Sequence, residues 1–206
     1  MQDVVFTIGH STQPAERFIA LLKQHGVTAV ADVRSKPYSR MNPQFNREDL
    51  REALSEADVA YVFLGTELGA RSEDRACYHD GKVQYGLLAQ TEAFRQGIGR
   101  VQEGARNFRI ALMCAEKEPL ECHRTILVAR HLEILGLDVR HILGDGRLES
   151  HTDAMNRLVR QLHLPEGDMF SSREDVVAEA YRLQEERVAY TLGADAPAGT
   201  VRSAAG

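Results

Sequence analysis

Residues 110–132 read IALMCAEKEPLECHRTILVARHL, and this stretch sets the expected fold. It starts with an apolar run, residues 110–112, that predicts a buried strand, and it ends with a second run, residues 125–132, that predicts a buried helix. The connection between them holds two of the three cysteines of the chain, an acid, a histidine and two cations. In open α/β folds such a connection lies at the carboxyl edge of the sheet, where ligands bind. We therefore expect the functional site here.

Four further runs rich in apolar and β-branched residues predict the other strands, at residues 4–9, 29–34, 60–64 and 138–143. Helical patterns separate them, and a helix between two apolar strands is the βαβ arrangement of a parallel sheet. The expected fold class is therefore α/β: a single, Rossmann-like three-layer domain. It has a mostly parallel five-stranded sheet with helices on both faces, and additional C-terminal helices.

The chain divides into three predicted parts. Residues 1–165 form an α/β core domain, because no Pro/Gly/Ser-rich linker interrupts them. Residues 166–192 are predicted to form a C-terminal helical extension that Ser172 caps, and the small and polar residues 193–206 a disordered tail. Within the core domain, residues 66–85 lack periodicity, which predicts a lid or a binding loop.

The composition is that of an ordinary globular chain of 206 residues, with 43% hydrophobic and 27% charged residues. No apolar run reaches the roughly 20 residues that span a bilayer, and the N-terminus lacks signal-peptide features, so we expect a cytoplasmic protein without membrane contact. Three cysteines make no disulfide framework, which fits a reducing compartment. The net charge of −5 disfavours an extended nucleic-acid footprint but allows a local basic patch.

If the five strands are parallel, the residues that follow them share one edge of the sheet. There the helix that starts at residues 122–124 offers unpaired N–H groups and a positive dipole end to an anion. An arginine can also grip a phosphate or a carboxylate with two hydrogen bonds. The candidate anion- or substrate-binding residues on this edge are Ser11, Asp32, Arg34, Lys36, His123 and Arg124.

Four residues of the same edge are candidate catalytic residues: Cys114, Glu116, Cys122 and His10. Cys122 lies at the helix start beside His123 and Arg124, which favours the thiolate and makes it a candidate nucleophile. Cys114 is either a second reactive thiol or an inert cysteine that ends a buried strand. Glu116 or His10 is the candidate general base. Asp32 can hold a ligand hydroxyl, orient His10 or pair with a cation.

A metal site is an alternative use of these residues. Cys114, Cys122 and His123, with His10 or Glu116, supply enough ligand types for zinc or iron. Their spacing matches no zinc module, so we assign no metal ligand and leave the cofactor open. The chain also lacks the Gly-x-Gly-x-x-Gly fingerprint, so no dinucleotide site is predicted.

As a set in this order, several short motifs resemble the family known as domain of unknown function 488. They are Thr7–Ser11, Asp32–Arg34 with Pro37 and Ser39, Phe45–Asn46, Leu68–Gly69, Cys114–Glu116, Cys122–Arg124 and His141–Ile142. The resemblance covers residues 4–150, and the segments at 168–170, 180–181 and 189–190 are similar to the tail of many members. One departure is Gly69–Ala70, where members often have Gly-Gly. The resemblance implies a compact α/β domain with a site built from these motifs, and it implies no activity.

These residues favour an enzyme: a thiol- or acid/base-assisted transferase or hydrolase that acts on an anionic, phosphorylated or nucleotide-like molecule at the C-terminal edge of the sheet. One alternative is a nucleic-acid or nucleotide binding module without turnover, in which Tyr38, Phe45 and Tyr78 stack on bases. Others are a zinc- or iron-binding domain and a scaffold domain with a vestigial pocket. The expected partner is an anionic small molecule or nucleic acid, and the oligomeric state is left open.

Overall fold

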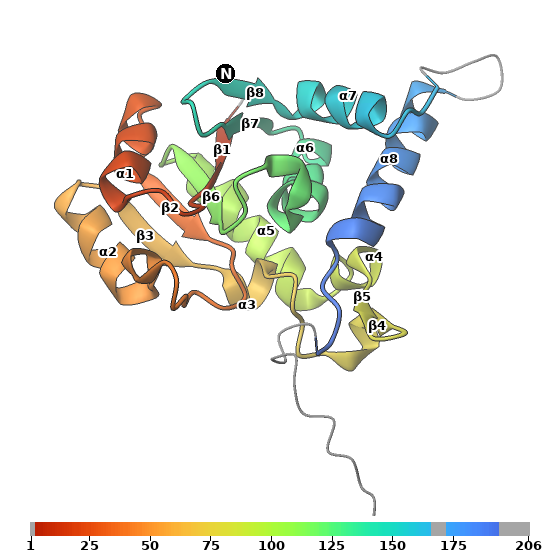
Figure 1. Ribbon diagram of the computed structural model, residues 1–206, viewed down its shortest axis with the longest axis horizontal. Coiled ribbons are helices and arrows are strands. Elements are labelled where there is room, and N and C mark those ends of the chain that lie inside the picture. Colours follow the sequence, from red (N-terminus) through yellow and green to blue (C-terminus); the bar gives the residue numbers. More distant parts are fainter. Residues whose placement is uncertain (1–2, 166–171, 194–206) are drawn as a thin grey trace, which may run out of the picture.

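The centre of the computed structural model, which describes residues 3–165 and 172–193, is a single twisted sheet (Figure 1). Its strands are β1 (Val4–Gly9), β2 (Ala29–Asp32), β3 (Ala60–Phe63), β6 (Ile110–Cys114), β7 (Asp138–Ile142) and β8 (Leu148–Ser150). They lie in the order β3-β2-β6-β1-β7-β8, and all neighbours are parallel except β7 and β8. The mixed α/β class with a mostly parallel sheet is thus confirmed.

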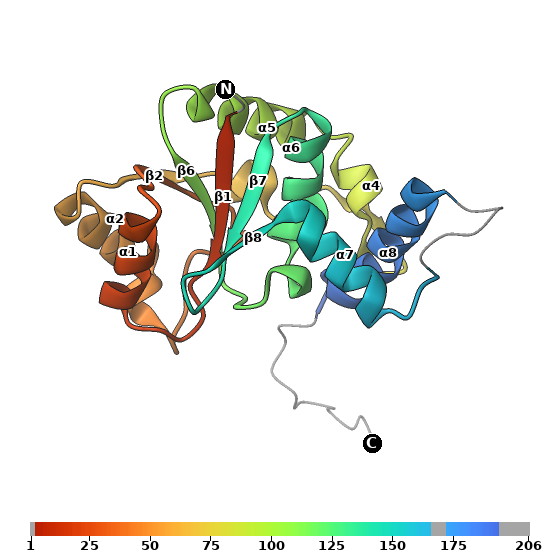
Figure 2. The same ribbon diagram turned by 90° about the horizontal axis from the view of Figure 1, so that it is seen from above.

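Helices cover both faces of the sheet, as Figure 2 shows. One face carries α1 (Ala15–Gln24) and α2 (Arg47–Glu56), and the other carries α5 (Glu92–Ala105), the π-helix η4 (Arg124–Ala129) and α6 (Arg130–Ile134). Successive residues of β1 point to opposite faces: Val5 belongs to the apolar cluster under α5 and η4, and Phe6 to the one under α1 and α2. The remaining helices are η1 (Pro43–Phe45), α3 (Gly65–Leu68), η2 (Arg75–Cys77), α4 (Tyr85–Leu88), η3 (Pro119–Glu121), α7 (His151–Gln161) and α8 (Arg173–Val188).

The sheet has six strands, so the predicted number of five is wrong. After β7 the chain turns through Gly146, whose φ of 90° favours glycine, and the Leu143 N–H donates to the Arg147 carbonyl at 2.9 Å. It then returns as β8, with Leu148 opposite Ile142. A three-residue edge strand is too short to give an alternating pattern, which is why the sequence shows only the turn.

Residues 66–85 contain more structure than the predicted lid. They hold η2 and a small hairpin formed by β4 (Tyr78–His79) and β5 (Lys82–Val83). Cys77 is buried in the core at the end of η2. The Val83 N–H donates to the Tyr190 carbonyl at 2.9 Å, so this segment is joined to the chain that follows α8.

The helix α8 packs against the core domain. Ser172 caps it, as predicted, and forms a capping box with Asp175. Gln184 donates to the Leu120 carbonyl at 2.9 Å, which ties α8 to η3. Two predicted segments lie outside the described residues. They are residues 166–171 of the extension, which include the Asp168–Phe170 motif, and residues 194–206 of the tail.

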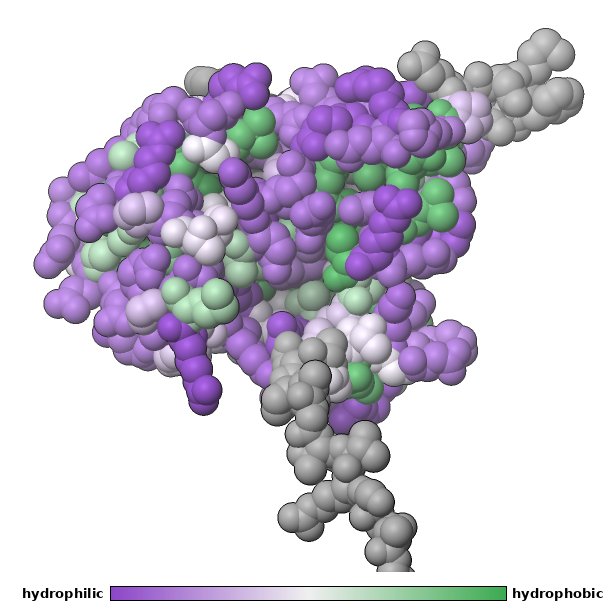
Figure 3. Space-filling view, in the orientation of Figure 1, coloured by the Kyte–Doolittle hydropathy of each residue, from purple (hydrophilic) through white to green (hydrophobic). Residues whose placement is uncertain are grey.

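Hydrophilic residues cover most of the face shown in Figure 3, and hydrophobic residues gather beside α8. Within residues 3–165 and 172–193, no helix combines the length and the apolar character needed to cross a membrane.

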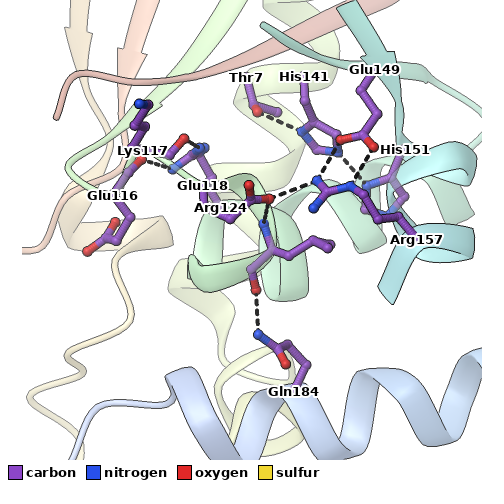
Figure 4. A network of polar contacts seen from close by, with 11 residues as sticks. Thr7, Glu116, Lys117, Glu118, Arg124, His141, Glu149, His151, Arg157 and Gln184 are labelled. Carbon is purple, nitrogen blue, oxygen red and sulfur yellow. Dashed lines mark hydrogen bonds and ion pairs between the residues drawn. The ribbon is translucent and has the colours of Figure 1, made fainter. Parts of the chain in front are cut away.

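A chain of buried hydrogen bonds links β1, β7, α7 and α8, and Figure 4 shows its part from Thr7 to His151. Thr7 Oγ1 lies 2.8 Å from His141 Nδ1, and His141 Nε2 lies 3.1 Å from Nδ1 of His151. His151 Nε2 then lies 2.6 Å from the Tyr181 hydroxyl. His141 is therefore a satisfied core histidine, and His151 belongs to this network rather than to the site.

These histidines predict a stability loss as the pH falls from about 6.5 towards 4. Burial and the charge of Arg130 lower the pKa of His151 from 6.5 to about 4, and burial also lowers the pKa of His141. The unfolded chain then binds more protons in this window, so the free energy of unfolding decreases as the pH falls, by roughly 3 kcal/mol for His151 alone. Urea titrations at about pH 7, 6 and 5 measure it. His151→Gln should flatten the dependence and the exposed His79→Gln should not; equal slopes in both variants would contradict the prediction.

Candidate functional site

A pocket of about 190 Å³ opens at the carboxyl ends of β2 and β6, on the edge that the sequence predicts. Residues that follow β2 form one wall, and the connection from β6 to η4 forms the base. The lining residues are Arg34, Ser35, Lys36, Ala70, Arg71, Tyr85, Cys114, Ala115, Glu116, Glu121, Cys122, His123, Val188 and Tyr190. We call this cavity the site pocket. The strands β2 and β6 are neighbours in the sheet but distant in sequence. Open α/β sheets bind ligands at the carboxyl ends of such strand pairs.

The connection after β6 is fixed by the neighbouring strand β1. The N–H groups of His10 and Ser11 donate to the carbonyls of Cys114 and Ala115, each at 2.9 Å, and so continue the parallel ladder beyond both strands. A Cβ on Gly9 would lie 1.9 Å from the Glu116 carbonyl oxygen, so only glycine permits this approach. The position of Glu116 therefore depends on Gly9.

Four polar side chains converge at the base of the site pocket, and we call them the thiol cluster: Cys114, Glu116, Cys122 and His123. The oxygen Oε2 of Glu116 accepts hydrogen bonds from the Cys114 thiol at 3.0 Å and from the Cys122 thiol at 2.9 Å. His123 Nδ1 lies 3.7 Å from Sγ of Cys114 and 3.8 Å from Sγ of Cys122. The structure thus brings together three of the four candidate catalytic residues.

The main chain fixes the orientation of the His123 ring. Its Nε2 lies 3.0 Å from the Val33 carbonyl oxygen, which can only accept a hydrogen bond. Nε2 therefore carries a proton, and Nδ1 faces the two sulfur atoms.

The groups of the thiol cluster influence one another's protonation. Burial and the neighbouring Cys122 raise the pKa of Cys114 well above its ordinary value. Burial acts in the same direction on Cys122, but the hydrogen bond with Cys114 and the charges of Arg124 and His123 outweigh it and lower its pKa. Burial and the charge on Cys122 raise the pKa of Glu116. The pKa of His123 is raised. Burial lowers it, but the hydrogen bond to Cys122 and the charges of Cys122 and Glu116 have the larger effect.

Asp32 and Arg34 form a buried ion pair beside the thiol cluster. Arg34 Nη2 lies 2.7 Å from Asp32 Oδ2 and Nε lies 2.9 Å from Oδ1, a two-pronged contact. Asp32 also accepts from the Tyr61 hydroxyl at 2.8 Å. Of the three roles open to Asp32, the structure shows the pairing with a cation, and only Arg34 of the pair lines the site pocket.

His10 lies behind Arg34 rather than in the site pocket. Its ring stacks on Phe45 with centroids 4.3 Å apart, and its Nε2 lies 3.3 Å from Arg34 Nη1. Nδ1 lies 2.7 Å from the Ser11 carbonyl, so that nitrogen carries the proton and Nε2 accepts from Arg34. Burial and the nearby arginines lower the pKa of His10 to about 4. Both of its ring nitrogens are thus engaged by the protein.

Arg124 lies beneath the site pocket, with its side chain fully buried. Its Nη1 donates to the Glu116 carbonyl at 2.7 Å and its Nη2 to the Lys117 carbonyl at 3.3 Å (Figure 4). The sequence predicts that this guanidinium binds an anion. In the structure it instead donates its hydrogen bonds to main-chain carbonyl oxygens. Ser11, another candidate, lines a different cavity together with Thr12, Arg17 and Lys117.

Several lining residues carry no local signal in the sequence. Tyr85 comes from α4, and its buried hydroxyl has no hydrogen-bond partner within the described part of the chain. Tyr190 follows α8, and the guanidinium of Arg71 lies over its ring at 4.6 Å. Arg71 adds positive charge to the rim beside Lys36, which the sequence does predict as a binding residue. Only the folded chain brings these segments next to the thiol cluster.

Fold and site together define an α/β protein with a cysteine-rich pocket at the carboxyl edge of a parallel sheet. The chain belongs to the family described as domain of unknown function DUF488, whose family model matches residues 14–131. Neither the comparison with curated proteins nor the comparison with solved structures gives a match. The resemblance seen in the motifs is therefore confirmed.

Proposed function

We propose that this protein is an enzyme that hydrolyses or transfers a group of a small anionic molecule bound in the site pocket. Glu116 donates and accepts the proton, and the two thiols beside it provide the nucleophile, directly as a thiolate or by holding an activated water. The observation that carries the proposal is the single carboxylate oxygen that both thiols contact at the base of the pocket. A carboxylate at hydrogen-bond distance from a nucleophilic centre is the arrangement that general acid/base catalysis needs.

The charge around the pocket supports an anionic ligand. Lys36, Arg71 and the largely buried Arg34 all line the pocket. The unpartnered Tyr85 hydroxyl adds a hydrogen-bonding group that a ligand can satisfy. The volume of about 190 Å³ is below the roughly 300 Å³ at which typical ligand pockets begin, which favours a phosphate ester or a short carboxylate over a whole nucleotide.

The burial of Phe45 removes one of the three aromatic rings on which the nucleic-acid alternative relies. This ring is fully buried between His10 and Phe18, so it is not available for stacking on a base. We therefore propose a small molecule as the partner.

Glu116→Gln is expected to lower kcat by at least about 100-fold, because the amide cannot exchange a proton. The probes are two small chromogenic anionic esters, p-nitrophenyl phosphate and mono(p-nitrophenyl) succinate, and the measurement is steady-state release of nitrophenolate. Glu92→Gln, on α5 outside the pocket, is the matched control and should leave turnover unchanged. The proposal fails if the wild-type protein turns over neither ester, or if Glu116→Gln retains full turnover.

A further inference from the structure

Three atoms with strong metal affinity converge in the thiol cluster. They are Sγ of Cys114, Sγ of Cys122 and Nδ1 of His123, and all lie within 4.8 Å of one another. Among residues 3–165 and 172–193, this is the one group of three or more histidine, cysteine or acidic residues with such an arrangement. All three side chains are buried, yet they line the site pocket, so a bound ion would face the cavity.

The spacing fits a tetrahedral ion. With Zn–S bonds of about 2.3 Å and Zn–N bonds of about 2.0 Å, a tetrahedral site separates sulfur from nitrogen by roughly 3.5 Å. The measured separations from His123 Nδ1 are 3.7 Å to Cys114 and 3.8 Å to Cys122. The Glu116 oxygen lies 3.0 Å and 2.9 Å from the same sulfurs, which is too close for a fellow ligand. Glu116 is thus a neighbour of the site and not part of it.

The hydrogen bond behind His123 is the second, independent observation. Metal-bound histidines usually donate their other ring N–H to a carbonyl or a carboxylate, which fixes the tautomer and aims the free nitrogen at the ion. The contact of His123 Nε2 with the Val33 carbonyl at 3.0 Å has this form. It leaves Nδ1, the nitrogen that faces both sulfurs, as the ring atom that can bind the ion.

We propose that Cys114, Cys122 and His123 bind a divalent cation of the zinc type, with the fourth position open to the site pocket. Two thiolates and one imidazole suit Zn²⁺, and an open fourth position distinguishes catalytic from structural sites. Loading releases one proton from each thiol to solvent, so the two S–H contacts with Glu116 are replaced by two metal–sulfur bonds. The ion site stands on its own geometry. The role of its water rests on the proposed function: the bound water loses a proton to Glu116 and becomes the nucleophile.

Titration of the reduced full-length protein with Zn²⁺, and with Co²⁺ as a spectroscopic substitute, tests the proposal. We expect about one ion per chain, together with the charge-transfer and d–d absorption of a tetrahedral cobalt thiolate. Cys114→Ser and Cys122→Ser should each weaken binding by more than about 100-fold. Cys77→Ser is the matched control, because Cys77 is buried but lies outside the cluster. Glu116→Gln should bind the ion as well as the wild type does.

Alkylation of the wild-type protein gives a readout that does not depend on the folding of any variant. Zn²⁺ should protect Cys114 and Cys122 from iodoacetamide and leave the modification of Cys77 unchanged, as followed by peptide mass spectrometry. Absent cobalt–thiolate bands, or equal labelling with and without Zn²⁺, would overturn the metal site. If Glu116→Gln still abolished turnover in that case, the proposed enzyme would stand with a thiolate nucleophile. Full turnover by that variant in a zinc-loaded protein would instead overturn the proposed function and leave the metal site intact.

Discussion

Replacing Arg124 with alanine is expected to lower the free energy of unfolding by about 3–5 kcal/mol. Arg124 is the largest of the fully buried side chains, so its truncation leaves a cavity under the site pocket. It also leaves the carbonyls of Glu116 and Lys117 without the donors that now lie 2.7 Å and 3.3 Å away. Hydrogen bonds from a charged group contribute about 1.5–3 kcal/mol each.

Urea unfolding of Arg124→Ala, Arg124→Lys and Arg140→Met measures this effect. Lysine keeps the charge but cannot span two carbonyls, so its loss should be intermediate. Arg140 is about half exposed in its pair with Asp138, and its replacement should change stability by less than about 0.5 kcal/mol. If Arg124→Ala were as stable as Arg140→Met, the guanidinium would not support the connection after β6.

Local patterns suffice to predict the parallel part of the fold. Four of the five longer strands are mainly apolar, β7 carries Val139 and Ile142 among polar residues, and each crossover contains a helix, so the pattern defines a βαβ sheet and its shared carboxyl edge. That edge fixes which segments meet, because residues that end parallel strands must lie side by side. Asp32, Arg34, Cys114 and Glu116 are neighbours for this reason. The edge strand β8 is missed because its pairing depends on a turn and not on a pattern.

Whether a polar side chain faces the pocket or bonds to other protein groups depends on its burial, which the sequence does not reveal. A cation at a helix start predicts an anion site, but Arg124 is fully buried and donates to main-chain oxygens. The position of His10 after the first strand predicts a general base. In the structure its ring stacks on Phe45 and its Nε2 accepts a hydrogen bond from Arg34, so this nitrogen is not available to a substrate. Short-range sequence shows that polar groups share an edge. It does not show which of them face the cavity.

The far wall of the site pocket illustrates a second limit. Tyr190 follows α8, well beyond the part of the chain that the family model matches, residues 14–131. It reaches the pocket because the small hairpin pairs with residues 190–192. The Val83 N–H donates to the Tyr190 carbonyl, the Leu192 N–H donates to the Gly81 carbonyl, and Lys82 lies opposite Thr191. No periodic pattern encodes that contact. The cluster at the base of the pocket was therefore predictable from one stretch of sequence, and the enclosure of the pocket was not.

Gly9→Ala is expected to lower the free energy of unfolding by about 3 kcal/mol and to displace Glu116 from the thiols. The backbone of Gly9 needs no left-handed conformation, so the effect is purely steric. The new methyl group would lie 1.9 Å from the Glu116 carbonyl oxygen and 3.1 Å from Lys117 Cα, both main-chain atoms. These atoms cannot move away without a loss of hydrogen bonds. Arg124 donates to that same oxygen at 2.7 Å, and the Ser11 N–H donates to the Ala115 carbonyl at 2.9 Å.

The matched control for Gly9→Ala is Gly99→Ala, in the middle of α5. A Cβ at Gly99 meets no atom within 4 Å, so this change should stabilise the protein by roughly 0.5–1 kcal/mol through helix propensity. Urea unfolding measures both variants, and iodoacetamide labelling of Cys114 and Cys122 reports the opening of the site in Gly9→Ala. A Gly9→Ala protein with wild-type stability and wild-type labelling rates would show that β1 and the connection after β6 do not approach closely in solution. In that case the carboxylate of Glu116 would have no fixed place beside the two thiols, and the acid/base role proposed for it would lose its structural basis.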